Sequence, residues 1–387
     1  MGWFRRARLR ALVVLVVVPT VAAVLPATPA VARDRVPGID VSFYQRRIDW
    51  RAVSKSHVRF AIVRASLGNS YVDTRYRRNV VGASAQGLTV GAYHYAKPGP
   101  DARDAKAEAR HFLRVARNAP GDVLPVLDIE SSGGLSRRQL WRWARRWLTI
   151  VREATGLRAM IYSGNYFWQH YMGNTAFFGR KGYPHWVAHW DVRRPDVPGR
   201  GWGGRGWTFW QWSAAGRVPG IAGPVDLDWF GGPDLLQGTI SSLDVDPAAM
   251  GSILGPRLSC GPGERRCGRL ANPGTELTLR AEPVAGARLV RWTGACVGAG
   301  RSSTCRLDVV GRLAVSAVFA PYWTGGAGIA SVAETPSRLD VEACDEGETG
   351  CAIATLVGEQ LHPRAEELVP ILLARSGAVR HRPGPSS

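Results

Sequence analysis

A regular succession of short β-rich apolar runs constrains the fold of this chain more than any other feature. Eight such runs lie between residues 33 and 235, and amphipathic helical patterns separate the earlier ones. The runs are Pro37–Val41, Phe60–Ala65, Leu88–Tyr95, Val123–Ile129, Ala159–Tyr162, Trp186–Trp190, Trp207–Trp212 and Val225–Trp229. Eight strands with helices in only the first five crossovers predict an α/β fold. We expect an irregular eight-stranded TIM-like barrel with about five helices.

Three helical patterns support this architecture. The clearest runs from Ser136 to Ala154, where Ser136 is the expected N-cap and Gln139 completes a capping box. Apolar residues recur there with the helical period, arginines occupy the other side, and Gly156 marks the end. Similar patterns predict helices over Thr74–Gln86 and Asp104–Ala119.

The fourth apolar run ends in two carboxylates, Asp128 and Glu130. Side chains alternate along a strand, so both acids point to the same face, with Cα atoms roughly 6.6 Å apart. Carboxylates that close cannot both ionise freely, and the pKa of one should rise. A neutral acid beside an ionised carboxylate is suited to cleaving a glycosidic bond. Taken alone, the motif more often marks two solvated acids at a strand end, and only its surroundings favour the catalytic interpretation.

Further acids occur in the first and last runs. Asp40 ends the first run, and Asp226 and Asp228 lie in the last. The first and last strands of a closed barrel are neighbours, so acids from three strands can converge on one mouth.

Aromatic residues accompany these acids. Tyr93 and Tyr95 share a face of the third run, and Trp210 and Trp212 share a face of the seventh. Their rings could stack on the apolar faces of sugars, although a single aromatic residue is more often part of a core.

The order of these motifs resembles that of the family 25 glycoside hydrolases, the lysozymes of the Chalaropsis and bacteriophage type. The similarity covers about residues 36 to 232. The resembling segments are Gly38–Gln45, Phe60–Ser66, Gly91–Ala96, Asp128–Glu130, Trp186–Trp190, Trp210–Trp212 and Val225–Asp228. The resemblance implies an N-acetylmuramidase that cleaves the β-1,4 bond between N-acetylmuramic acid and N-acetylglucosamine in peptidoglycan.

The resemblance also assigns roles. Glu130 matches the general acid and Asp128 its partner carboxylate, while Asp40 and Asp226 match two further acids of the cleft. The expected substrate-binding residues are Tyr93, Tyr95, Tyr162, Trp190, Trp210 and Asp228. The family usually shows Lys-x-Ser/Thr-Glu-Gly where this chain has Arg64-Ala65-Ser66-Leu67-Gly68, so one family carboxylate is missing.

Two mechanisms are compatible with these acids. The short spacing of Asp128 and Glu130 favours attack by the substrate's own 2-acetamido group, with retention of configuration. A two-carboxylate route with Asp40 or Asp226 as base or nucleophile stays open.

The alternative function is a non-catalytic glycan-binding protein on a decayed barrel, which the survival of all four acids disfavours. No GxSxG or HExxH motif indicates another class of hydrolase.

The amino-terminal segment has the pattern of a secretory signal peptide, predicted to be residues 1–32. Four arginines among the first ten residues precede an apolar run from Ala11 to Leu25, and Ala30-Val31-Ala32 supplies small residues for cleavage. No later run is long and apolar enough for a membrane span. We therefore expect a secreted protein, extracellular or associated with the cell wall.

The chain is strongly basic, with 50 Lys and Arg against 31 Asp and Glu, a formal charge of +19. Such a charge favours anionic partners, and after export these would be peptidoglycan and anionic cell-wall polymers. The arginines are dispersed, which argues against nucleic acid. We expect a monomer that needs no cofactor and no metal.

All six cysteines lie beyond residue 250, so the barrel region contains none. Their grouping makes three local disulfides the simplest of 15 pairings: Cys260–Cys267, Cys296–Cys305 and Cys344–Cys351. Residues 256–320 show short strand-like runs and resemble small bacterial surface β-repeat modules, with wall attachment or a structural role. Residues 236–255 are expected to be a linker that leaves the barrel unconstrained. Residues 321–387, with a helix around Arg364–Leu373 and a disordered end, have no assigned role.

Overall fold

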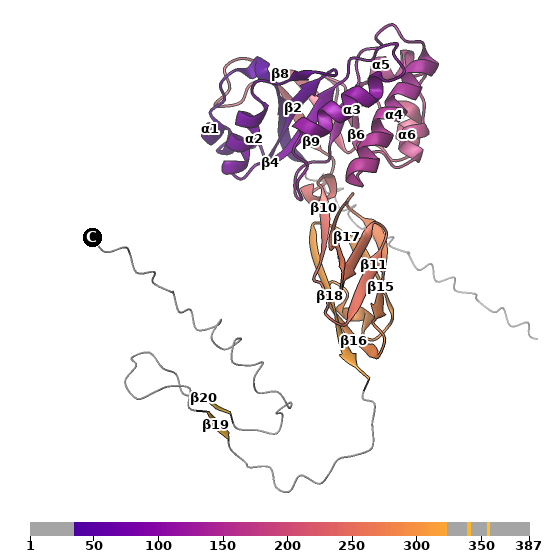
Figure 1. Cartoon of the computed structure of the whole chain (residues 1–387). Helices are drawn as coiled ribbons and strands as arrows, with labels where there is room; N and C mark the ends of the chain where they lie inside the picture. The colour runs from indigo at the N-terminus through magenta and orange to yellow at the C-terminus, as the bar shows by residue number, and fades with distance from the viewer. Residues whose placement is uncertain (1–34, 323–338, 342–353, 357–387) are drawn as a thin grey trace, which may run out of the picture. The chain divides into compact units, whose positions relative to one another are not determined.

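The structure is a computed structural model that describes residues 35–322 and two short strands further on, β19 (Leu339–Val341) and β20 (Ala354–Leu356) (Figure 1). These two strands pair with each other in antiparallel fashion and belong to a separate unit that begins at Trp323. The predicted signal peptide, the Cys344–Cys351 pair and the predicted helix around Arg364–Leu373 lie outside the described residues.

The first part of the chain forms the expected closed barrel, and each of the eight predicted runs contributes a strand. The strands are β1 (Val36–Val41), β2 (Phe60–Leu67), β4 (Thr89–Tyr95), β5 (Val126–Asp128), β6 (Met160–Gly164), β7 (His185–Ala188), β8 (Phe209–Gly216) and β9 (Val225–Phe230). The short β3 (Tyr71–Val72) pairs only with β2. Apart from β3, which is antiparallel to β2, the strands from β1 to β8 are parallel to their neighbours, whereas β9 is antiparallel to both β8 and β1 and closes the barrel.

Helices cover the outside of the barrel in the crossovers. They are α1 (Trp50–Ser54), α2 (Tyr76–Ala85), α3 (Asp104–Val115), α4 (Arg137–Thr155), α5 (Asn165–His170), α6 (Phe177–Arg180) and α7 (Pro198–Gly203), and a 3₁₀ turn, η1 (Phe43–Gln45), follows β1. The three predicted helices are α2, α3 and α4. In α4 the capping box of Ser136 and Gln139 is present, and Gly156 ends the helix in the left-handed conformation with φ 83°. The additional helices α1, α5, α6 and α7 have six residues or fewer.

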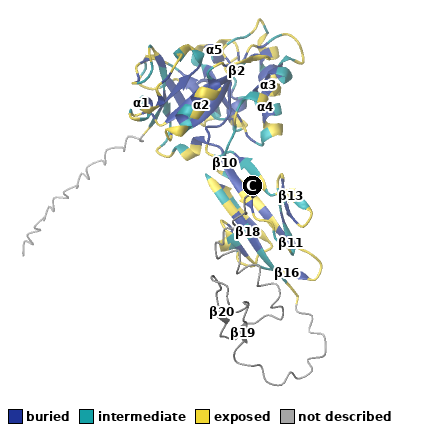
Figure 2. Cartoon of the chain, turned by 60° about the vertical axis from the view of Figure 1, so that its left-hand side comes forward, coloured by how far each residue is buried: buried dark blue, intermediate teal, exposed yellow. Residues whose placement is uncertain are grey.

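The alternation of side chains along each strand divides the hydrophobic core into two layers. One layer lies between the strands and the helices and includes Trp147, Leu127 and Ile161. The other fills the interior of the barrel with large rings and branched side chains, among them Phe60, Ile62, Tyr93, Met160, Trp186, Phe209 and Phe230. The strands are accordingly buried on both faces (Figure 2). The interior is thus packed, and only its mouth is open to a ligand.

Residues from 241 to 321 form two β-sheets. Their strands are β10 (Ser241–Val245), β11 (Gly251–Gly255), β12 (Leu258–Gly261), β13 (Glu264–Arg266), β14 (Gly268–Ala271), β15 (Thr275–Pro283), β16 (Ala287–Gly294), β17 (Thr304–Val309) and β18 (Arg312–Pro321). The orders are β14-β10-β18-β16 and β13-β12-β11-β15-β17. The Cys260–Cys267 and Cys296–Cys305 disulfides are present as predicted.

The segment expected to be a linker differs from that expectation. It supplies a 3₁₀ turn, η2 (Leu235–Gly238), and the strands β10 and β11, each paired within one of the two sheets. Ile240, fully buried, packs with Leu124 and Leu157 of the barrel in a small hydrophobic cluster. The β-sheet region therefore constrains the barrel, because this apolar cluster is shared between the two regions.

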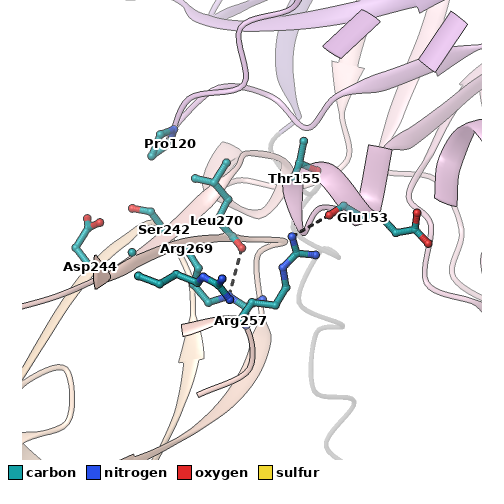
Figure 3. Close-up of a pocket in the computed structure, with 10 residues that line it drawn as sticks. Pro120, Glu153, Thr155, Ser242, Asp244, Arg257, Arg269 and Leu270 are labelled. Carbon is teal, nitrogen blue, oxygen red and sulfur yellow. Dashed lines mark hydrogen bonds between the residues drawn. The ribbon is translucent and has the colours of Figure 1, made fainter. Parts of the chain in front are cut away.

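Hydrogen bonds reinforce this contact. Asn272 accepts a hydrogen bond from the backbone N–H of Arg158 at 2.7 Å and donates one to its carbonyl oxygen at 2.9 Å. Arg257 donates to the carbonyl oxygens of Arg152 and Glu153 in the last turn of α4, and Figure 3 shows the hydrogen bond to Glu153. A cavity beside this contact is lined by residues of both regions, and Arg269 there donates to the carbonyl of Leu270.

Candidate active site

Four residues that pair in register across neighbouring strands lie at the open end of the barrel. Tyr95, Asp128, Tyr162 and Trp186 are successive partners across β4, β5, β6 and β7. In parallel strands, partners in register point to the same face, and here that face is the barrel interior. The intervening residues, such as Leu127, point outward to the helices.

The first and last strands bring three more acids to this place. Asp40 of β1 lies directly opposite Asp226 of β9, and Asp228 lies opposite Gly38. Because β9 is antiparallel, Asp226 near its start reaches the end of the barrel where β1 and β5 finish. Asp228 lies deeper and is only 1% exposed. The acids from β1, β5 and β9 thus converge.

A pocket of about 270 Å³ opens between these residues. Four acids line it, namely Asp40, Asp128, Glu130 and Asp226. Asp128 and Asp40 are buried, whereas Glu130 follows the end of β5 and is exposed at the rim. The pair of acids from the fourth predicted strand therefore provides one buried and one accessible carboxyl.

Crowding of these acids raises their pKa values. Burial raises the pKa of Asp128 well above its usual value, and the charge of Glu130 and a hydrogen bond to it raise it further. The pKa of Glu130 is also raised, chiefly by loss of hydration among the pocket atoms, while its hydrogen bond with Asp128 lowers it. Two carboxyls that share a hydrogen bond must hold a proton between them. The pair can therefore supply one acid and one carboxylate.

A second carboxyl pair lies behind the first. Asp40 and Asp228 come from the paired strands β1 and β9, and burial together with the charges of neighbouring acids raises the pKa of both well above the usual value. Trp186 Nε1 donates to Oδ1 of Asp228 at 2.8 Å. Asp226 is more accessible, and burial and the charge of Glu130 raise its pKa to about 6.

Gln211 of β8 connects the acids to the aromatic residues, a role that the sequence analysis missed. Its Nε2 donates to Oδ2 of Asp40 at 2.7 Å, and its Oε1 accepts from the hydroxyl of Tyr162 and from Nε1 of Trp190. The signal was present, because alternation along β8 places Gln211 on the face opposite to Trp210 and Trp212.

Arg64 supplies the positive charge of the pocket. Its Nε donates to Oδ2 of Asp73 at 2.9 Å, both side chains are buried, and its guanidinium lies over the rings of Phe43 and Tyr44. Nη2 of Arg64 is buried without a hydrogen-bond partner among the described residues. Its charge lowers the pKa of Asp128, opposing the effect of burial there.

The predicted aromatic residues divide into two groups. Tyr93, Tyr95, Tyr162 and Trp190 line the pocket, as does the exposed ring of Tyr44, which the sequence analysis did not single out. Trp210 does not contact the pocket. It is buried on the other face of β8, where its Nε1 donates to the carbonyl of His189. Its role in substrate binding therefore stays a prediction that this position does not support, whereas Trp186 and Gln211 line the pocket. Asp228 likewise is not among the residues that line the pocket, and its charge raises the pKa of Asp40.

A buried Ser-His-Glu set is the other constellation with catalytic residue types. Nδ1 of His94 is 2.8 Å from the hydroxyl of Ser66, and its Nε2 is 2.8 Å from Oε2 of Glu108. All three are buried within the barrel wall, so no substrate reaches the serine, and the set ties β2 and β4 to α3.

A metal cluster and a membrane-spanning helix are both absent from residues 35–322 and the two short strands. No group of His, Cys, Asp and Glu side chains there is arranged to hold a metal ion. None of the helices in this part of the chain has the length and apolar character needed to cross a membrane.

A closed barrel with paired carboxyls and aromatic rings at its mouth has the architecture of a glycosidase. The model of the glycosyl hydrolases family 25 matches residues 39–221. The chain is 38% identical over 210 residues to lysozyme M1 of Streptomyces globisporus, covering 51% of this chain and 68% of that protein. It is 30% identical to an N,O-diacetylmuramidase of Arthroderma benhamiae, covering 58% and 96%. A bacterial lysozyme structure from Streptomyces coelicolor is 35% identical, with a TM-score of 0.48 and coverage of 51% and 93%. The chain belongs to the glycosyl hydrolases family 25.

Proposed function

We propose that this protein is a secreted peptidoglycan hydrolase that cleaves the β-1,4 bond between N-acetylmuramic acid and N-acetylglucosamine. The observation that carries the proposal is the hydrogen-bonded pair of Asp128 and Glu130 at the mouth of a family 25 barrel. The names of the lysozyme and muramidase relatives support the choice of substrate.

The two carboxyls differ in what they can reach. Glu130 lies at the rim, where a glycosidic oxygen can approach it, whereas Asp128 lies below it. Apart from the carboxyl pair, Oδ1 of Asp128 has no hydrogen-bond partner within the described residues. A buried carboxylate oxygen of this kind is costly unless a donor satisfies it. The N–H of a substrate acetamido group is a suitable donor.

This arrangement supports a substrate-assisted route. An acetamido N–H donates more strongly to an ionised carboxylate than to a neutral carboxyl, so substrate binding favours the state in which Asp128 is ionised and Glu130 holds the proton. Glu130 then protonates the leaving glycosidic oxygen while the acetamido oxygen bonds to the anomeric carbon and the glycosidic bond breaks. Asp128 stabilises the positive charge that develops on the acetamido group. Water then attacks the anomeric carbon and loses a proton to Glu130, the bond from the acetamido oxygen breaks, and the original configuration and the acetamido group are restored.

The rings and the second carboxyl pair hold the sugar for this reaction. Tyr95, Tyr162 and Trp190 offer surfaces on which sugar rings can stack. Asp40 and Asp226 lie opposite Asp128 and can accept hydrogen bonds from sugar hydroxyls. A two-carboxylate route would instead make one of them the base or nucleophile, and it predicts a covalent glycosyl-enzyme or inversion.

The test of the catalytic assignment is the Glu130→Gln variant. It should abolish the loss of turbidity of purified cell walls while binding to insoluble peptidoglycan persists, because the amide keeps the shape but donates no acidic proton. Glu153→Gln, an exposed change on α4, is the control and should retain full activity. Activity above a few per cent in Glu130→Gln would remove Glu130 from the acid role.

Analysis of the products identifies which glycosidic bond the protein cleaves. Borohydride labelling should convert the new reducing ends to muramic acid derivatives, and NMR of the first product should show the β-anomer. Glucosaminitol as the new terminus would contradict the proposed specificity. An α-anomer as the first product would contradict retention.

A further inference from the structure

A second polar cavity lies at the end of the barrel strands opposite to the acid pocket. Its volume is about 720 Å³, and it is formed by the segment from Arg180 to His185, the segment from Trp202 to Thr208, and the Asn272–Glu276 turn of the β-sheet region. His185 is the first residue of β7, whereas Trp190 of the acid pocket lies beyond the last residue of that strand.

The cavity is strongly basic. Four cationic side chains line it, those of Arg158, Arg180, Lys181 and Arg205, and Glu276 is the one carboxylate among its lining residues. We call this cavity the basic pocket. In the part of the chain that the structure describes, none of the four cations forms an ion pair with a carboxylate within 4.0 Å. Their charge is therefore available to a ligand.

The basic residues of the other junction cavity differ in this respect. Arg257 there donates to two barrel carbonyls and so joins the two regions, whereas Arg269 donates to the carbonyls of Leu270 and Pro256 within the β-sheet region. Because these two guanidiniums already donate to backbone carbonyls, the basic pocket is the better site for an external anion.

Backbone geometry shapes the wall of the basic pocket. Trp202 has φ 52° and Gly203 φ 65°, within a turn of successive residues in the left-handed conformation. This conformation costs a residue with a β-carbon about 1–2 kcal/mol. At Gly203 a β-carbon would lie 2.9 Å from Cγ of Arg180, so the stem of that arginine lies closely against the glycine. The turn therefore restricts the orientation of Arg180.

The same turn places Trp202 on the floor of the pocket. Its ring stacks flat on His185, with centroids 3.8 Å apart and an angle of 4° between the planes. His185 is fully buried, and neither ring nitrogen has a hydrogen-bond partner among the described residues. Burial lowers the pKa of His185 to about 3, so the ring is neutral and has one N–H left to donate. An unpartnered donor among the lining residues of a cavity with four cations is suited to an anionic oxygen.

We propose that the basic pocket binds a phosphate-bearing anionic polymer of the cell wall. Guanidinium groups match phosphate oxygens with paired hydrogen bonds, and three arginines from three separate segments surround the cavity. A polymer with repeated phosphodiesters suits an open pocket on a protein of charge +19. Binding here leaves the acid pocket, at the other end of the strands, free to meet glycan, and tethering raises the local concentration of enzyme.

The test is co-sedimentation of the full-length protein with purified Gram-positive walls at low temperature. The walls are used before and after hydrofluoric acid has removed their phosphodiester polymers. The test variant is Arg180→Gln/Arg205→Gln. Its matched control is Arg110→Gln/Arg114→Gln, which removes the same charge from exposed positions on α3. We expect about tenfold weaker binding of the test variant to intact walls, and wild-type binding by the control. All three proteins should bind stripped walls equally and more weakly.

The proposal is independent of the proposed hydrolysis, and the readouts separate the two. Cleavage of soluble glycan fragments should be the same in the test variant and the wild type. Equal binding of the test variant and the wild type to intact walls would overturn the proposal, as would an equal loss in the control. Wild-type binding to duplex DNA as tight as to walls at the same salt would assign the pocket to nucleic acid instead. If the double variant does not fold, Lys181→Gln/Arg205→Gln is measured in the same way.

Discussion

Gln211 Nε2 donates a hydrogen bond of 2.7 Å to Oδ2 of Asp40. The orientation of the amide is fixed, because its Oε1 accepts from Tyr162 and Trp190 and only its nitrogen can face the acid. Asp40 must therefore present an acceptor at this oxygen, and the hydrogen bond lowers its pKa against the larger effect of burial. Gln211 is thus a positioning residue that links the carboxyls to the sugar-stacking rings.

We expect Gln211→Glu to lower kcat/KM on soluble glycan by about 10- to 100-fold near neutral pH, the loss of one hydrogen bond to a charged group. The new carboxylate can still accept from Tyr162 and Trp190, but it donates to Asp40 only when protonated. Activity relative to the wild type should therefore recover as the pH falls. Gln211→Leu should lose activity without this recovery. Equal losses at every pH in both variants would contradict the role assigned to the amide.

Asp226 should make stability depend on pH. Its folded-state pKa of about 6 lies above its usual value of 3.8, so between these values the folded state binds more protons than the unfolded state. The stability contributed by this group is present at low pH and is lost as the pH rises through about 6. Asp226→Asn should raise Tm by about 2–4 °C near neutral pH, if it relieves about 1 kcal/mol, and by less near pH 4. Calorimetry at both pH values tests this prediction. An equal rise in Tm at both pH values would show that electrostatic repulsion at Asp226 does not cause the stabilisation.

Arg64 should influence the acid limb of the activity profile. Its charge lowers the pKa of Asp128, so Arg64→Met should raise that pKa. Asp128 must be ionised to stabilise the positive charge that develops on the acetamido group, and the acid limb of kcat/KM should therefore move to higher pH. Removal of the cation also leaves Asp73 buried without its partner, which costs about 3–5 kcal/mol of stability. Arg64→Lys keeps the charge and should show a smaller change in both quantities. An unchanged acid limb in Arg64→Met would contradict the electrostatic role.

Local patterns were sufficient to predict the barrel and the acids. Alternation and helical period identified the eight strands and the long helices, and the spacing of Asp128 and Glu130 indicated their common face. The direction of β9 could not be inferred in this way, because alternation is the same in either direction. That direction determines which end of the strand, and hence Asp226 rather than Asp228, reaches the mouth.

Partners distant in sequence account for most of what the sequence did not reveal. Residue type alone favours Trp210 over Gln211 as a sugar-binding residue, because aromatic rings stack on sugars. The inward face of β8, however, is determined by its pairing with β7 and β9. The contact of Ile240 with Leu124 joins residues more than a hundred positions apart, and no local pattern signals it. The segment around Ile240 therefore resembled a linker.

Removal of everything after Gly238 should destabilise the barrel. The cut takes Ile240 from its cluster and exposes Leu124 and Leu157, which costs about 2–3 kcal/mol at the usual value for buried apolar area. Denaturant unfolding of the truncated and full-length proteins measures this, and Ile240→Ala in the full-length chain is the matched control, with a loss of the same sign. A truncated protein as stable as the full-length chain would show that the cluster contributes nothing.

Reduction of the disulfides should have a separate effect. Both described bridges close short loops within the β-sheet region, and each contributes about 2–3 kcal/mol to that region. The barrel contains no cysteine, and its contact with Ile240 and Asn272 does not pass through a bridge. Cys296→Ala/Cys305→Ala should therefore lower the unfolding midpoint of the β-sheet region while cleavage of soluble glycan is retained at moderate temperature. Loss of that cleavage under conditions in which the β-sheet region is still folded would mean that the bridge acts on the acid pocket. Loss only where that region unfolds would show how strongly the barrel depends on its neighbour.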